Sequence, residues 1–196
     1  MSKRILDLMI ACAGLVLLSP ALLLIGAWIK WDSPGPVFFL QERVGRRGRL
    51  FNIFKFRTMY FQTGPSKLLT VGRDSRITSA GHFLRRYKLD ELPQLLNVML
   101  GSMSLVGPRP EVPRYVACYP PDMRVLVLSV SPGITDWAAI EYRDESTLLA
   151  ASSDPERAYI EQVLPAKLRL YARYVRERNF WTDLRILFRT LIVIMR

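Results

Sequence analysis

The longest apolar stretch of the chain lies near its start, where Ile5–Ile29 contains only two ionisable side chains, those of Asp7 and Cys12. As a single helix this stretch would be roughly 37 Å long, which is enough to cross a hydrocarbon core of about 30 Å. Ser19-Pro20 interrupts it near the middle. Proline removes a backbone donor and bends a helix, and the serine hydroxyl can bond a carbonyl that the bend frees. The pattern therefore predicts a bent apolar helix.

Three interpretations of this apolar helix are open. A cleaved signal peptide is the least favoured, because aromatic and basic residues follow the stretch where a polar mature sequence is expected. A kinked helix that spans the membrane is the simplest. A broken helix that enters and leaves by the same leaflet is slightly preferred, since Lys3 and Arg4 precede the stretch and Lys30 follows it. We therefore predict a re-entrant membrane helix over residues 1–31, followed by one functional unit over residues 32–196.

The next segment, "SPGPVFFLQERVGRRGRLFNIFKFRTM", has aromatic and β-branched residues on both sides of a turn that contains Gly45 and Gly48. This pattern predicts a β-hairpin or paired extended segments. Strand alternation places Lys55 and Arg57 on one face of the second strand, where two cations can bind a phosphate. For the isolated pattern, a solvated basic face or a face on anionic lipid head groups is the simpler interpretation.

The segment "RRYKLDELPQLLN" contains an acidic pair, Asp90 and Glu91, in front of an apolar run. Pro93 suits the first position of a helix and Gly101 suits its end, so we predict a short helix over Pro93–Leu100. The acidic pair then lies just before a helix N-terminus, which attracts carboxylates and also binds phosphate. A helix cap is the simpler explanation of a lone acidic pair. We expect the nearby cations and the helix N-terminus to keep Asp90 ionised.

Two arginines near the acidic pair favour phosphate chemistry over a helix cap. Arg85 precedes the pair, and Arg109 follows it between two prolines in "LVGPRPE". Proline on both sides limits the backbone freedom of Arg109. A guanidinium held in this way is suited to a bidentate contact with phosphate.

The last third of the chain has a helical pattern. Its charged side chains, Lys167 among them, fall mostly off an apolar stripe, and the final segment mixes aromatic residues and leucines with Arg185 and Arg189. Core helices and interfacial helices explain this pattern about equally well. The stripe consists of Leu164, Leu168, Tyr171 and Val175.

Composition limits the partners. The chain has 196 residues, a formal net charge of +11 and 50% hydrophobic residues, which favours an anionic membrane surface, nucleic acid or phosphorylated substrates. The two cysteines, Cys12 and Cys118, lie far apart and predict neither a disulfide nor a zinc site. With His82 as the single histidine, acid–base chemistry falls to carboxylates.

Several long motifs resemble the bacterial sugar transferase family of monotopic phosphoglycosyl transferases. They cover nearly the whole chain and are "KRILD", "SP" in the apolar run, the hairpin segment, "LRRYKLDELPQLLNVMLGSMSLVGPRPE" and "SPGIT". The resemblance implies an α+β fold, mainly α, with a re-entrant membrane helix, a small catalytic domain that contains a β-hairpin, and interfacial amphipathic helices. It also implies a monotopic protein of the bacterial inner membrane whose catalytic domain faces the cytoplasm.

The resemblance implies the reaction as well. A UDP-sugar gives its sugar-1-phosphate to polyprenyl (undecaprenyl) phosphate and UMP is released, as the first membrane step of exopolysaccharide, capsule, O-antigen or glycoprotein glycan biosynthesis. Asp90 would be the nucleophile that forms a covalent aspartyl-phosphosugar intermediate, and Glu91 the neighbouring acid–base and positioning group. Mg²⁺ would be the cofactor, with Asp90 as a metal ligand. Ser19 and Pro20 would form the turn of the re-entrant helix. The predicted substrate-binding residues are Lys55, Arg57, Arg85, Arg109 and Arg143.

One segment departs from the family's pattern. The commonest motif runs P-G-I-T-G-W-A-Q-V-N-G-R, whereas this chain has "PGITDWAAIEYRDESTLLA". Arg143 still matches the terminal arginine of that motif. The departure over Asp136–Glu145 falls where substrate selection is expected, so the sugar and the nucleotide are left open.

Two other functions compete with this reading. A basic membrane-surface module without chemistry, binding anionic lipid or nucleic acid, explains the charge but not the acidic pair or the constrained arginine. A membrane glycosyltransferase that moves sugar without phosphate is the second alternative. We expect a phospholipid membrane and no nucleic acid as partners, and a homodimer is left open.

Overall fold

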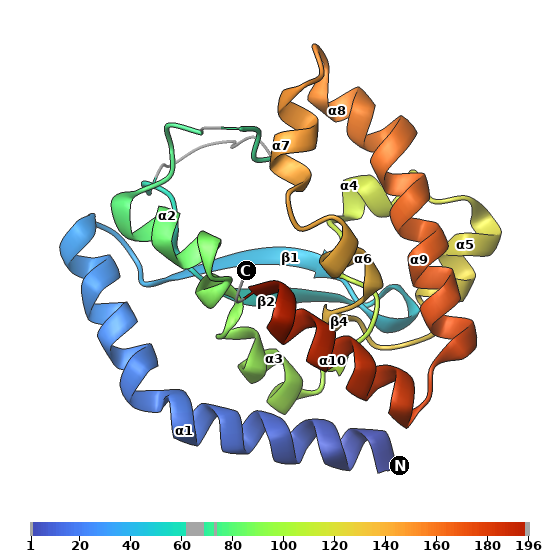
Figure 1. Ribbon diagram of the computed structural model, residues 1–196, viewed down its shortest axis with the longest axis horizontal. Helices are drawn as coiled ribbons and strands as arrows, with labels where there is room; N and C mark the ends of the chain where they lie inside the picture. The colour runs from blue at the N-terminus through green and yellow to red at the C-terminus, as the bar shows by residue number, and fades with distance from the viewer. Residues whose placement is uncertain (1, 62–68, 73, 195–196) are drawn as a thin grey trace.

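The computed structural model describes residues 2–61, 69–72 and 74–194. In this part of the chain the protein is mainly helical, with two small sheets, which confirms the predicted α+β, mainly α, class (Figure 1). The helices are α1 (Ser2–Asp32), α2 (Ser79–Arg86), α3 (Gln94–Leu100), α4 (Pro113–Val116), α5 (Pro121–Val127), α6 (Trp137–Glu141), α7 (Glu145–Ala150), α8 (Pro155–Ala158), α9 (Leu164–Glu177) and α10 (Phe180–Ile194). The strands are β1 (Phe38–Val44), β2 (Leu50–Phe56), β3 (Ser104–Val106) and β4 (Gly133–Thr135). Short 3₁₀ turns cover Arg46–Gly48 and Leu89–Glu91, and a π-helical turn covers Tyr159–Val163.

The predicted hairpin is confirmed. Strands β1 and β2 pair antiparallel, with Val44 opposite Leu50 at the turn, and Gly48 adopts a positive φ of 76° that glycine favours. The second sheet is a parallel pair, with Ser104 of β3 opposite Gly133 of β4. It places the segment after β3 beside the start of α6.

Two glycines make the close approach of β3 and β4 possible. A Cβ added to Gly133 would lie 2.0 Å from the backbone nitrogen of Gly107, so neither position has room for a side chain. Backbone hydrogen bonds continue past the strands, from Gly107 to the carbonyl of Thr135 (3.1 Å) and from Gly133 to the carbonyl of Pro108 (3.0 Å). These bonds fix the backbone that leads into Arg109.

The long helix α1 is bent near its middle (Figure 1), and Pro20 lies inside it. The Ser19 hydroxyl donates to the carbonyl oxygen of Val16 at 2.8 Å. Val16 is four residues before Pro20, so its carbonyl is the one that the missing proline N–H leaves unpaired. The predicted bend and its serine contact are therefore both present.

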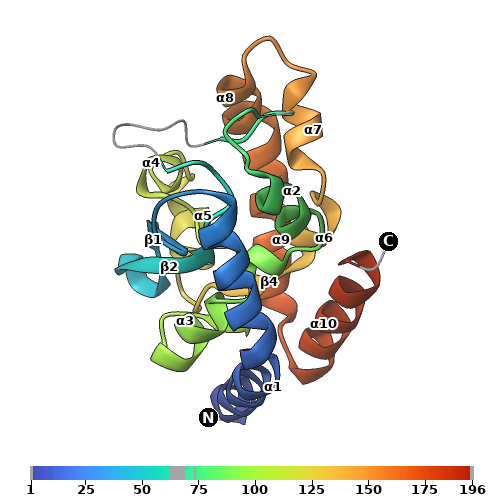
Figure 2. The ribbon, with the colours of Figure 1, turned by 90° about the vertical axis from the view of Figure 1, so that its left-hand side faces the viewer.

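Both halves of α1 pack on the rest of the protein. In the first half, Arg4 donates to the carbonyl of Val98 (2.7 Å), and Asp7, which is 5% exposed, accepts from the Ser104 hydroxyl (2.7 Å). In the second half, Ile29 packs with core residues of β2 and α2. In the view of Figure 2, α1 crosses the molecule between the β1–β2 hairpin on one side and α10 on the other.

The outer surface of α1 is apolar and exposed. Over its most apolar window the mean hydropathy is 2.6 and 6% of the residues are buried, so by length and composition this helix could cross a membrane. Exposed side chains on it include Val16, Leu17, Leu23, Leu24 and Trp31.

The two last helices differ in burial. Helix α9 is a core helix, because Leu164, Leu168 and Tyr171 of its predicted stripe are at most 3% exposed. Lys167 is a correction to the pattern, which assigned it to the polar side. It is buried, because Glu111 and Glu145 lie within 3.1 Å of its ammonium group. Helix α10 buries Ile186 but exposes the apolar side chains of Phe180, Trp181, Leu184, Phe188 and Leu191. Both cysteines, Cys12 and Cys118, are free and exposed.

Candidate active site

The acidic pair lies in the 3₁₀ turn Leu89–Glu91, between α2 and α3. Lys88 turns the chain into this segment with a positive φ of 55°, and Gly101 ends α3 with a φ of 88°, so the predicted short helix is confirmed. Among the described residues, neither Asp90 nor Glu91 donates to or accepts from the first amides of α3, and no side chain caps this helix. The helix-cap interpretation of the pair is therefore wrong.

Glu91 joins two cations that come from distant parts of the chain. Strand β2 contributes Lys55, whose Nζ lies 3.0 Å from Glu91 Oε1. The segment after β3 contributes Arg109, whose Nη1 donates to Glu91 Oε2 at 3.0 Å while Nη2 donates to Oε1. The Arg109 contact is bidentate, which is the geometry that a guanidinium also offers to a phosphate.

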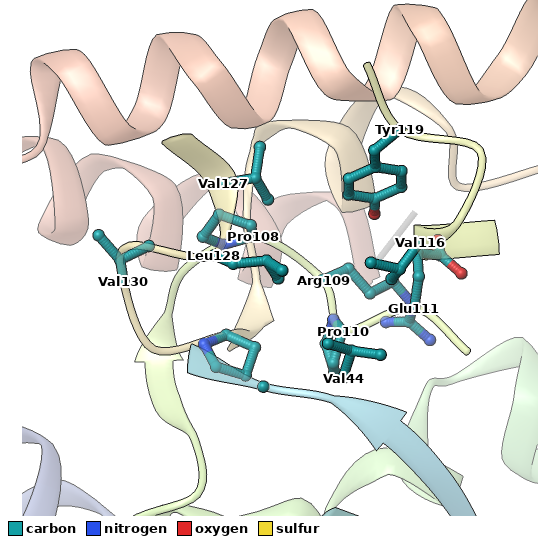
Figure 3. Close-up of a pocket in the computed structure, with 12 residues that line it drawn as sticks. Val44, Pro108, Arg109, Pro110, Glu111, Val116, Tyr119, Val127, Leu128 and Val130 are labelled. Atoms are coloured by element: carbon teal, nitrogen blue, oxygen red, sulfur yellow. The ribbon is translucent and has the colours of Figure 1, made fainter. Parts of the chain in front are cut away.

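Packing and hydrogen bonds fix the loop that carries Arg109. Figure 3 shows Arg109 between Pro108 and Pro110, with Val44 and Tyr119 nearby. The backbone N–H of Arg109 donates to Asp136 Oδ2 (3.3 Å). The cavity in Figure 3 has a volume of about 10 Å³, so it has room for about one water molecule and none for a nucleotide sugar.

Arg85 lies on the other side of the acidic pair, at the end of α2. Its Nε donates to the Thr58 hydroxyl (2.8 Å) and its Nη1 to the Thr70 hydroxyl (3.2 Å). Burial lowers the pKa of Arg85, and the charge of Asp90 acts in the opposite direction. Neither threonine was expected at the site, since a lone threonine after a strand or in a polar loop carries no distinctive signal in the sequence.

The structure does not bring Arg57 and Arg143 to this cluster. Strand β2 ends at Phe56, so strand alternation no longer applies to Arg57. Its buried guanidinium donates to the carbonyls of Ser33 (2.7 Å), Ile29 (3.3 Å) and Pro34 at the end of α1. Arg143 donates to the carbonyl of Val193 near the end of α10. Of the predicted site residues, those assembled around one centre are Lys55, Arg85, Asp90, Glu91 and Arg109.

Comparison with known proteins shows the family of this chain. A family model described as "Bacterial sugar transferase" matches residues 1–196. The chain belongs to the bacterial sugar transferase family.

Three relatives illustrate the family. The UDP-glucose:undecaprenyl-phosphate glucose-1-phosphate transferase of Escherichia coli K12 is 37% identical over 96% of this chain and 39% of its own length. The UDP-N-acetylgalactosamine-undecaprenyl-phosphate N-acetylgalactosaminephosphotransferase of Aeromonas hydrophila is 35% identical over 98% of this chain and 43% of its own length. A UDP-glucose:undecaprenyl-phosphate glucose-1-phosphate transferase of Caulobacter vibrioides is 34% identical over 96% of this chain and 67% of its own length. The chain thus spans about two fifths of the length of the first two.

The pKa values of the two site carboxylates are shifted in opposite directions in this sugar transferase. Burial, followed by the charge of Glu91, raises the pKa of Asp90 above its ordinary value, although Lys55 and Arg85 act against this. The cations act on the pKa of Asp90 in the expected direction but do not outweigh burial, and its ionisation near neutral pH stays a prediction. Burial alone would also raise the pKa of Glu91, but Arg109 and Lys55 outweigh it and hold that pKa well below its usual range.

The residues of the site fit Mg²⁺ only if the substrate supplies further ligands. Within the described residues there is no group of three or more His, Cys, Asp or Glu side chains that could hold a metal. However, Asp90 Oδ1 is buried and has no hydrogen-bond partner in the part of the chain that the structure describes, so a carboxylate oxygen can take a ligand. Mg²⁺ is commonly bound by one or two carboxylates together with substrate phosphates, and this donor set suits that arrangement.

Proposed function

We propose that this chain is a phosphoglycosyl transferase that moves a sugar-1-phosphate from a UDP-sugar to undecaprenyl phosphate. The single observation that carries the proposal is a buried carboxylate, Asp90, whose Oδ1 is unpartnered beside a glutamate held by two cations. The relatives' names describe transfer of glucose-1-phosphate or phospho-N-acetylgalactosamine to undecaprenyl phosphate, which supports the substrate class. We also propose that this transfer is the first membrane step of glycoconjugate biosynthesis.

In the first half-reaction, a carboxylate oxygen of Asp90 attacks the phosphorus that bears the sugar. The bond from this phosphorus to the bridging oxygen breaks, and UMP leaves with that oxygen and its electron pair. In the second, an oxygen of undecaprenyl phosphate attacks the same phosphorus and Asp90 is released as a carboxylate. Charge neutralisation and positioning dominate phosphoryl transfer, and Lys55, Arg85 and Arg109 are the side chains placed for both tasks.

Glu91 acts in this scheme as the residue that positions Lys55 and Arg109. Because its pKa is held well below the usual range, Glu91 is ionised near neutral pH and holds both cations before substrate arrives. When the donor phosphates bind, Arg109 and Lys55 share their hydrogen bonds between substrate and Glu91. Any proton that the second half-reaction releases would pass to Glu91 only after these cations have turned to the substrate.

Mg²⁺ belongs to the proposal as a cofactor bound by Asp90 and the donor phosphates. When bound, it would neutralise part of the charge that the two anionic reactants bring together. EDTA treatment should abolish UMP release, and added Mg²⁺ should restore it. Full activity after exhaustive chelation would remove the metal from the proposal.

We also propose that α1 is re-entrant and that the domain faces the cytoplasm, at the bacterial inner membrane. This is supported by the bend at Pro20, by the packing of both halves of α1 on the domain, and by the apolar outer surface. Cysteines introduced by Lys3→Cys and Lys30→Cys should both react from the cytoplasmic side in a background without native cysteines. Labelling of Lys3→Cys from the opposite side would exclude re-entry. Pro20→Ala should shift the helix toward a full span.

The covalent step is tested by intact-protein mass. Purified protein is incubated with Mg²⁺ and UDP-glucose or UDP-N-acetylgalactosamine, without lipid acceptor. Wild type should gain the mass of a phosphosugar and release UMP, while Asp90→Asn should stay folded and gain nothing. Glu91→Gln should lose turnover yet still collect adduct. Adduct on Asp90→Asn at the wild-type level would reject the nucleophile, and release of UDP would indicate sugar transfer without phosphate.

A further inference from the structure

A second unpartnered polar atom lies close in sequence to Asp90. Gln94 is 1% exposed, and its Nε2 has no hydrogen-bond partner among the described residues, like Asp90 Oδ1. Asn97 in the same helix shows the usual state of a buried amide. It is equally buried, but its Nδ2 donates to the carbonyl of Asn52 (2.8 Å) and its Oδ1 accepts from the N–H of Phe54 (2.9 Å). An unpaired buried amide is unfavourable for folding and calls for a functional explanation.

The backbone places Asp90 and Gln94 in adjacent turns of one helical segment. The 3₁₀ turn Leu89–Glu91 leads directly into α3, because Leu92 (φ −55°, ψ −37°) and Pro93 (φ −60°, ψ −15°) are both helical. Backbone hydrogen bonds between residues three apart continue through it, from Leu92 to Leu89 (3.2 Å) and from Leu95 to Leu92 (3.1 Å). Both side chains are buried, so the Gln94 amide and the Asp90 carboxylate lie inside the protein about one turn apart along the chain.

The chemistry of the two atoms limits what can bind between them. An amide nitrogen carries hydrogens, so it needs an acceptor, and a metal ion cannot satisfy it. Asp90 Oδ1 is an acceptor, yet the two atoms do not bond to each other in this structure. A phosphoryl group meets both needs, because its phosphorus bonds to Oδ1 and its free oxygens accept hydrogen bonds.

We propose that Gln94 donates a hydrogen bond to a phosphoryl oxygen of the phosphosugar on Asp90, and that Oδ1 is the attacking oxygen. The inference rests on the proposed function. The new Oδ1–phosphorus bond forms as the bond to UMP breaks, and Gln94 keeps its hydrogens throughout. Lys55 and Arg109 are engaged by Glu91 before substrate binds, whereas the Gln94 donor is free. Gln94 thus orients the phosphorus toward Oδ1 without adding charge.

The test compares stability with the rate of adduct formation in Gln94→Met. Methionine fills a similar volume but has no donor, so the variant loses an unpaired buried group and should melt at the same temperature or higher. Adduct formation from UDP-glucose or UDP-N-acetylgalactosamine should slow about 10- to 100-fold, as expected for one hydrogen bond to a charged group. Gln162→Met makes the same chemical change at an exposed position in the π-helical turn and should leave both properties unchanged.

Each other outcome is decisive. An adduct rate within twofold of wild type in Gln94→Met would overturn the inference, and so would a fall of stability and rate together, which indicates a structural role. Gln94→Glu should form adduct even more slowly, because a second carboxylate repels the phosphoryl group. If Gln94→Glu instead formed adduct faster than Gln94→Met, position 94 would face a cation, and this result would also overturn the inference. If wild type itself forms no adduct with these two donors or with a wider panel of UDP-sugars, the proposed function fails, and the inference fails with it.

Discussion

The segment Pro108–Glu111 contributes one side chain to each of two buried charge clusters, and the clusters differ in how their charged atoms are paired. In the Glu111 cluster, Glu111 Oε1 accepts from Tyr159 (2.7 Å) and from Lys167 (3.1 Å), and Lys167 also contacts Glu145 (3.1 Å). Burial would raise the pKa of Glu111, but Lys167 leads the interactions that hold it below the ordinary value. Every charge in this cluster faces an opposite one.

In the Glu91 cluster, by contrast, the pairing of charged atoms is incomplete. Glu91 is fully engaged by Lys55 and Arg109, while its neighbour Asp90 keeps an unpartnered oxygen and a raised pKa. A complete network stabilises a core, whereas an incomplete one leaves bonding capacity for a ligand. Burial of charge alone therefore does not identify a functional site, and an unpaired charged atom, the Oδ1 of Asp90, is what separates the two clusters among the described residues.

The two clusters should differ most in how much they contribute to the stability of the fold. Lys167→Met should lower the free energy of unfolding by about 3–5 kcal/mol, because Glu111 is left buried without its main cation. Lys55→Met should lower it by less than about 2 kcal/mol, since Glu91 keeps its bidentate contact with Arg109. Denaturant unfolding of both variants in detergent measures the two values. Equal losses would contradict the distinction between the clusters.

The second difference is in activity. Arg109→Lys should remain folded but release UMP about 100-fold more slowly, because an ammonium group cannot replace a planar bidentate donor. Arg124→Lys, an exposed position on α5, is the matched control and should retain wild-type turnover. Near-normal turnover of Arg109→Lys would reduce Arg109 to a structural role.

Local patterns were sufficient to predict much of the site. Turn residues and proline positions predict the hairpin, the α1 bend and α3, because these depend on neighbours in the chain. Strand alternation singled out Lys55, the acidic pair Glu91 and the flanking prolines Arg109, and the structure brings these three together. Their mutual pairing was not predicted, since it requires the strand, the turn and the β3 segment to meet in space.

Long-range contacts explain what the sequence could not predict. Arg57 is directed to carbonyls at the end of α1, and Lys167 to Glu111, 56 residues away. Neither partner is visible in a local pattern. The raised pKa of Asp90 was not foreseen for a related reason, because burial is its largest cause and depends on how the whole domain packs.

A smaller effect should appear in the pH dependence at Asp136, which lies between the clusters and accepts from the Arg109 backbone. Burial raises its pKa to about 6, against the Ala139 hydrogen bond and the charges of Lys167 and Arg109. Because this pKa is higher in the folded than in the unfolded chain, the protonated Asp136 side chain stabilises the fold at low pH. That stabilisation is lost as pH rises through about 6. The free energy of unfolding of wild type, compared with that of Asp136→Asn, should therefore fall by about 1.5 kcal/mol between pH 5 and pH 8. Urea unfolding at both pH values measures this difference. A pH-independent difference would contradict this.

The smallest expected effect concerns substrate affinity. Lys55→Ala should raise the KM for the UDP-sugar about threefold at low salt, because one of several cations is lost while Arg109 remains. The ratio to wild type should shrink as salt rises, since screening weakens charge attraction. UMP release measured over a salt series gives this ratio. A large fall in kcat with unchanged KM would instead assign Lys55 to the transition state.

The polar contacts that hold the first half of α1 have a consequence for the order of synthesis. Arg4 bonds to Val98, Asp7 to Ser104 and Lys3 to Asp183, so their partners follow 94, 97 and 180 residues later in the chain. At about 5–20 residues per second, the ribosome needs roughly 10–35 s to reach the last of them. During translation α1 therefore emerges before every partner that anchors its start. Helix α1 is held in part by a contact with α10, so the anchoring of α1 is completed only when α10 has been made.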